Sequence, residues 1–123
     1  MNKIDKLKTD MGKHSLSEYP KECVGIITKD FEYIPCKNIS ETPTTNFLLD
    51  PVPLVLHDGN IWGIYHSHPG EELPIPSDED VIGASFDEYK FIVGFKDKFF
   101  IYWASNKTKK LRFEPLEERH FES

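Results

Sequence analysis

The sequence predicts a single α/β domain in which a mixed β-sheet is flanked by two or three helices. Runs of β-branched and aromatic residues recur along the chain, and turn residues separate them. Helical patterns fall at the N-terminus and between some of these runs. With 123 residues, the chain is long enough to bury one hydrophobic core.

An amphipathic helix is predicted at the N-terminus, because Ile4, Leu7 and Met11 recur at helical spacing among charged residues. Gly12 is expected to weaken this helix, since glycine is a poor helix former. We expect the helix to restart through residues 14–18.

The sheet is predicted from the strand-like runs. A nearly uncharged run at 22–28 has the character of a buried central strand. A turn at Lys29-Asp30 follows, and residues 31–39 alternate well enough to pair back on that strand. The remaining expected strands lie at 46–49, 61–67, 89–95, 98–104 and 111–113.

Three further segments complete the expected domain. Residues 51–56 fit either a short helix or an extended segment, because Pro51 and Pro53 suit both. A helix is predicted over residues 77–85, where Ser77 and Asp80 resemble a capping box. Residues 116–123 are mostly charged and are expected to form a loose C-terminal tail, so the domain is expected to span residues 1–115.

Composition excludes several classes of protein. The formal net charge of −6 argues against a surface that follows nucleic-acid phosphates. No run of about 18 apolar residues is present to span a membrane, and the charged N-terminus lacks the apolar core of a signal peptide. The only two cysteines, Cys23 and Cys36, have no metal-type spacing. A reducing interior is therefore the default, although a disulfide between them stays open.

Two histidines at the end of the 61–67 strand are the candidate metal ligands. Side chains two apart on a strand project from the same face, so His66 and His68 should point together. Pro69-Gly70 ends the strand, and Asp80 follows in the first turn of the next helix. Two imidazoles and a carboxylate suit zinc, and three protein ligands leave a fourth position open, as in catalytic sites.

Each part of this pattern also has a simpler explanation. Exposed histidines two apart are common, and a helix start needs a cap and favours a carboxylate for reasons of its own. Glu22 is the candidate proton shuttle, because it precedes an otherwise uncharged strand; a solvent-facing position is the alternative. Together, the pieces favour the metal site.

Several stretches carry a family resemblance. They are PKECVGII at 20–27, IYHSHP at 64–69 and SDED at 77–80, together with YIPCKN at 33–38 and the following Pro43, Phe47, Asp50 and Pro51. These strings resemble the JAMM (MPN-plus) zinc metallopeptidase family, in its bacterial and phage branch. The branch includes the N-terminal domain of phage tail-assembly peptidases. The resemblance implies the JAMM/MPN fold, which is similar to that of cytidine deaminases.

The resemblance also implies roles for five residues. His66, His68 and Asp80 would bind Zn²⁺, Glu22 would be the general acid/base, and Ser77 would donate a hydrogen bond to the oxyanion. One departure is the loop 70–76, whose seven residues replace the six that the family usually has.

The implied function is zinc-dependent hydrolysis of an amide bond by a peptidase or isopeptidase. The implied substrate is a peptide or protein: a ubiquitin-like or sulfur-carrier tail, or a cell-wall or phage tail peptide. The expected location is the cytoplasm of a bacterial host or a phage virion tail, with no nucleic-acid or membrane partner. A cysteine-peptidase domain often follows in phage members, so we expect either a stand-alone form or part of a longer protein. The alternative is a non-catalytic module for phage tail assembly on the same fold.

Overall fold

The computed structural model describes residues 2–77, 89–104 and 110–122. Its elements, in chain order, are α1 (Lys3–Glu18), β1 (Val24–Thr28), β2 (Tyr33–Cys36), α2 (Pro51–Leu56), β3 (Ile61–Ser67), β4 (Lys90–Phe95), β5 (Lys98–Ala104), β6 (Leu111–Pro115) and the 3₁₀ turn η1 (Glu118–Phe121).

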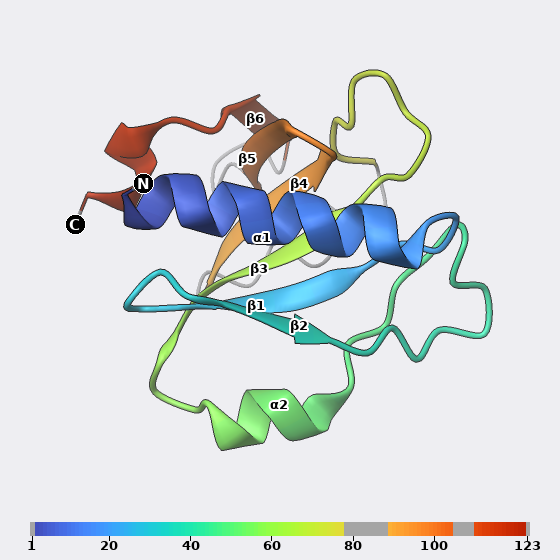
Figure 1. Cartoon of the computed structure of the whole chain (residues 1–123), viewed down its shortest axis with the longest axis horizontal. Coiled ribbons are helices and arrows are strands. Elements are labelled where there is room, and N and C mark those ends of the chain that lie inside the picture. The colour runs from blue at the N-terminus through green and yellow to red at the C-terminus, as the bar shows by residue number, and fades with distance from the viewer. Residues whose placement is uncertain (1, 78–88, 105–109, 123) are drawn as a thin grey trace.

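The strands form one six-stranded sheet in the order β2-β1-β3-β4-β5-β6. β3 and β4 pair in parallel, and every other neighbouring pair is antiparallel. α1 runs across one face of this sheet (Figure 1). The predicted α/β class with a mixed sheet is therefore confirmed.

The main hydrophobic core lies between α1 and the sheet. Leu7 and Met11, predicted as the apolar stripe of the N-terminal helix, are 1% and 0% exposed. They pack against side chains from alternating positions along four neighbouring strands, which all point to this face. These are Cys23, Ile27, Tyr65, Ile92, Phe99 and Ile101.

The prediction that the N-terminal helix restarts after Gly12 is wrong. α1 is continuous from Lys3 to Glu18. Gly12 lies closely against the β4–β5 turn, because a Cβ atom there would collide with the backbone carbonyl oxygen of Lys96. Ser15 strengthens this contact, since its Oγ donates to the Gly12 carbonyl (2.7 Å) and accepts from the Lys96 amide (3.1 Å).

Replacing Gly12 by alanine is expected to destabilise the fold by about 1–3 kcal/mol, the usual cost of overpacking. Helix propensity alone would favour alanine by about 1 kcal/mol, but the colliding atom belongs to the backbone of a tight turn and cannot rotate away. Urea unfolding measures the difference, with the neighbouring exposed Lys13→Ala as control. A more stable Gly12→Ala protein would contradict the close approach.

The predicted 31–39 strand is shorter than expected. β2 begins at Tyr33, because Phe31 adopts a left-handed conformation (φ 63°) and belongs to the turn. Its ring packs edge-on against Trp62. Residues 46–49 form no strand; Leu49 makes one isolated bridge with Asn38.

Residues 51–56, left open by the sequence, form the helix α2. Asp50 caps it by accepting from the amide of Val52 at 3.0 Å, and Pro51 occupies the first helical position. The following Asp58-Gly59 turn, with Gly59 at φ 82°, therefore joins a helix to β3 rather than two strands.

The expectation of a loose tail over residues 116–123 is also wrong. Leu116 and Phe121 are each 7% exposed and belong to the main core. Phe121 stacks on Trp62 with ring centroids 4.9 Å apart. The C-terminal segment lies beside the start of α1 (Figure 1), where Asn2 donates to Glu118 at 3.2 Å. The two apolar residues are too widely spaced among charges to give a periodic signal.

The helix predicted over residues 77–85 lies, beyond Ser77, outside the described residues. Within the described part of the chain, neither α-helix has the length and apolar character needed to cross a bilayer.

Candidate metal centre

The candidate site lies where the start of β1 meets the end of β3 in the centre of the sheet. The two strands are antiparallel, with Val24 opposite His66. This register places Glu22, just before β1, beside the histidines at the end of β3. Ser67 locks the register, because its Oγ accepts from the Cys23 amide (2.7 Å) and its amide donates to the Cys23 carbonyl (3.0 Å).

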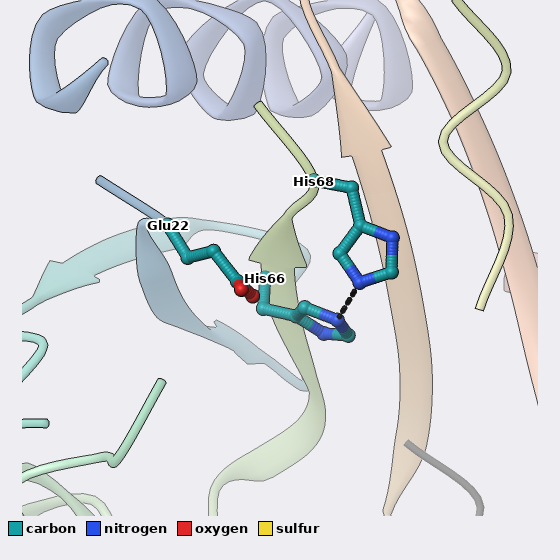
Figure 2. A group of neighbouring side chains, drawn as sticks. All are labelled: Glu22, His66 and His68. Atoms are coloured by element: carbon teal, nitrogen blue, oxygen red, sulfur yellow. Dashed lines mark hydrogen bonds between the residues drawn. The ribbon is translucent and has the colours of Figure 1, made fainter. Parts of the chain in front are cut away.

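Glu22, His66 and His68 converge and are buried, at 6%, 1% and 8% exposure. One carboxylate oxygen and one nitrogen from each ring all lie within 4.8 Å of one another. Nε2 of His66 is 3.2 Å from Nε2 of His68 (Figure 2). The expectation that the two rings point together thus agrees with the geometry.

The other nitrogen of each ring faces an oxygen atom. Nδ1 of His68 lies 3.4 Å from Oε2 of Glu71, and Nδ1 of His66 lies 3.5 Å from the hydroxyl oxygen of Tyr102. The Tyr102 oxygen can accept from an Nδ1–H group of His66, which favours the tautomer that leaves the Nε2 lone pair of that ring available. The Glu71 contact with His68 is at ion-pair distance and is not a hydrogen bond. Metal-binding histidines commonly have such outer partners.

These residues fit a zinc ion. Two nitrogens bound at about 2.0–2.1 Å to one tetrahedral zinc stand about 3.3–3.4 Å apart, close to the observed 3.2 Å between the two Nε2 atoms. A divalent cation would also compensate the charge of the buried Glu22 carboxylate, which is otherwise unfavourable in an apolar interior. Nitrogen and carboxylate oxygen are both donors that zinc accepts.

Phe47 restrains the ring of His66. The two rings stack with centroids 4.4 Å apart and planes inclined by 23°. Phe47 belongs to the irregular loop between β2 and α2, so a segment with no regular structure covers one side of the site.

A cavity of about 600 Å³ adjoins the site, and Glu22 is among its lining residues. The C-terminal part of α1 and the strand β2 with the residues after it form the walls of the cavity. The lining residues include His14, Glu18, Cys36 and Asn38. Among the described strands, β2 is at the edge of the sheet, so this cavity lies beside a strand edge that no other described strand pairs with.

The two cysteines are free thiols, so the disulfide left open by the sequence is not formed. Burial raises the pKa of the Cys23 thiol to about 12. Cys23 is therefore a protonated core residue at neutral pH, and not a nucleophile or a thiolate ligand.

The structure describes four of the five residues expected in the site and brings three of them together. Glu22, His66 and His68 form one buried group. Ser77 is exposed at the end of the described 2–77 segment, and Asp80 lies outside the described residues. The assignment of the five roles stays a prediction.

Sequence reasoning gave no role to Ser67, Glu71 or Tyr102. The position of Ser67 could have been predicted, because a residue between two histidines on a strand faces the opposite side of the sheet from them. Glu71 directly follows the Pro69-Gly70 turn, where a charged side chain ordinarily faces solvent. Tyr102 comes from β5, and nothing local in the sequence indicates its position beside His66.

The sequence is similar to known proteins. The profile of the prokaryotic homologs of the JAB domain matches residues 5–115. Tail tip assembly protein K of Escherichia phage N15 is 38% identical over 61 residues, which are 46% of this chain and 25% of that protein. The "Probable TtuB-protein conjugate cleaving protease" of Thermus thermophilus is 40% identical over 76 residues, or 53% of this chain and 51% of that protein. This chain thus matches about a quarter and about half of the length of these two relatives.

Proposed function

Because this chain belongs to the prokaryotic homologs of the JAB domain, we propose that it is a zinc-dependent peptidase or isopeptidase that hydrolyses an amide bond. The observation that carries the proposal is the buried group of Glu22, His66 and His68, whose ligand atoms lie within 4.8 Å of one another. A hydrolytic centre needs a carboxylate beside its metal ligands, and a structural zinc site does not.

His66, His68 and Asp80 hold the Zn²⁺ ion in this proposal. When bound, the ion supplies a Lewis acid for the scissile carbonyl and lowers the pKa of water. Tyr102 orients the ring of His66 from its Nδ1 side, and the Glu71 carboxylate lies beside Nδ1 of His68. Ser67 holds β1 and β3 in the register that brings Glu22 to the histidines.

Glu22 moves the proton. Its carboxylate takes a proton from the attacking water and returns it to the nitrogen that leaves the substrate. Ser77 donates a hydrogen bond to the oxyanion that forms on the substrate carbonyl. The position of Glu22 supports this role, because its carboxylate is buried and lies beside the two histidines.

The proposed substrate is an extended peptide or the tail of a protein conjugate. The cavity beside Glu22 and the open edge of β2 support an extended chain, which can pair with an edge strand. The name of the Thermus thermophilus relative, a conjugate-cleaving protease, supports a conjugated protein as the substrate class.

A second candidate function is a non-catalytic role in tail assembly. The name of the relative from Escherichia phage N15 favours it, since that protein is a tail tip assembly protein. The virion tail is then the proposed location.

Zinc content and turnover together test the proposal. Elemental analysis of the purified protein is expected to give about one zinc per chain. The probes for turnover are quenched fluorogenic peptides with main-chain or lysine-linked amide bonds. Hydrolysis should stop with 1,10-phenanthroline and return with added zinc. Turnover that persists in the chelator would contradict the proposal, and bound zinc without turnover of any probe would favour the assembly role.

A further inference from the structure

The side chain of Asn38, just after β2, makes hydrogen bonds with five separate backbone groups. Its Nδ2 donates to the carbonyl of Glu22 at 2.8 Å and to that of Asn46 at 3.0 Å, with a longer contact to the Pro43 carbonyl at 3.5 Å. Its Oδ1 accepts from the amides of Ser40 and Leu48, each at 3.0 Å. A single amide group thus uses both donors and both acceptor positions.

These bonds connect the two halves of the candidate metal centre. On one side is Glu22, whose carbonyl is bound by Asn38 and whose amide donates to the Pro43 carbonyl at 2.7 Å. Both backbone groups of Glu22 are therefore fixed by the loop that Asn38 organises.

On the other side is Phe47. Asn38 binds the residues immediately before and after it, Asn46 and Leu48. The position of the Phe47 ring, which stacks on His66 at 4.4 Å, therefore depends on the same side chain.

We infer that Asn38 is a positioning residue of the metal centre, which holds Glu22 and the ring packed on His66 in one fixed arrangement. The inference rests on the function proposed above. Asparagine suits the role because it offers two donors and two acceptor positions on one planar group, whereas aspartate offers acceptors alone. In this irregular loop the side chain replaces the pairing that a regular strand would supply.

Two variants separate the donor and acceptor halves of this role. Asn38→Asp removes the donors to Glu22 and Asn46 but keeps the acceptor for Ser40 and Leu48. Asn38→Leu has a similar size, adds no charge and removes both halves. Asn60 is exposed, and no side-chain hydrogen bond is found for it within the described residues. Asn60→Asp and Asn60→Leu are therefore matched controls.

The first readout is amide hydrogen exchange, which does not depend on turnover. In Asn38→Asp the Glu22 amide should exchange at least about tenfold faster while the Leu48 amide stays slow. In Asn38→Leu both should exchange faster. The Ile92 and Ile101 amides, in the paired strands β4 and β5, report global opening and should not change. If Asn38→Leu does not fold, the Asp variant carries the test.

The second readouts are zinc affinity and catalysis. Outer partners of a metal site typically contribute 10–100-fold to affinity or activity, so zinc affinity or kcat/KM should fall by about 10–100-fold in both variants and stay unchanged in the Asn60 controls. Unchanged Glu22 exchange with wild-type zinc affinity would overturn the inference, as would faster exchange at Ile92 and Ile101. An absence of turnover in the wild type would sink the proposed function but leave exchange and zinc affinity to decide the role of Asn38.

Discussion

Glu22→Gln is expected to lower kcat by about 10²–10⁴-fold, the usual contribution of a general acid/base, while the protein keeps its zinc. Glutamine has the size of glutamate but cannot take a proton from water at neutral pH. The proposed ligands His66, His68 and Asp80 are untouched. Peptide turnover and elemental analysis on the same preparation measure both quantities.

The proximity of Glu22 to both histidines makes this experiment decisive. If Glu22 were a ligand in place of Asp80, Glu22→Gln would lose zinc together with activity. If it had no chemical role, the variant would be fully active. Glu32→Gln, at an exposed position before β2, is the control and should match the wild type in both measurements.

His68→Ala is expected to weaken zinc binding by more than about 100-fold, because loss of a direct ligand should exceed the 10–100-fold effect of losing an outer partner. Turnover should fall with it. Zinc should raise the melting temperature of the wild type, since a ligand that binds only the folded state stabilises it. It should not do so for the variant. Competition with a chromophoric chelator gives the affinity.

His57→Ala is the matched control, because His57 lies in the turn after α2 and outside the buried group. It should bind zinc as the wild type does. Asp80→Asn is expected to lose both zinc and hydrolysis, in contrast to Glu22→Gln. Zinc binding that survives in both His68→Ala and Asp80→Asn would remove these residues from the metal site.

Much of the fold could be predicted from the sequence, because the patterns that indicate it are local. The buried run of β1 and the apolar stripe of α1 follow from hydrophobic periodicity. The sequence missed features that depend on distant partners. Glycine's low helix propensity predicted a break at Gly12, whereas packing against Lys96 makes the absence of a side chain favourable there. Leu116 and Phe121 looked like tail residues because their contacts, to Phe99 and Trp62, come from elsewhere in the chain.

The candidate site divides in the same way. The pairing of His66 with His68 was predictable, because alternation along a strand is a property of the strand itself. The contacts around these two rings were not predictable. The partners lie in a loop, as Asn38 and Phe47 do, or in a later strand, as Tyr102 does. Contacts from such positions follow no periodic pattern in the sequence.

By itself, the sequence determined which chemical groups this protein carries and which of them share a strand face. Only the tertiary structure decided that the carboxylate of Glu22 meets the two imidazoles, because that meeting depends on the antiparallel register of β1 and β3. Cys23 and Ser67, whose bond locks this register, stand 44 positions apart in the chain. Such a register is set by long-range hydrogen bonding and by burial of one sheet face. Neither can be predicted from a short stretch of residues.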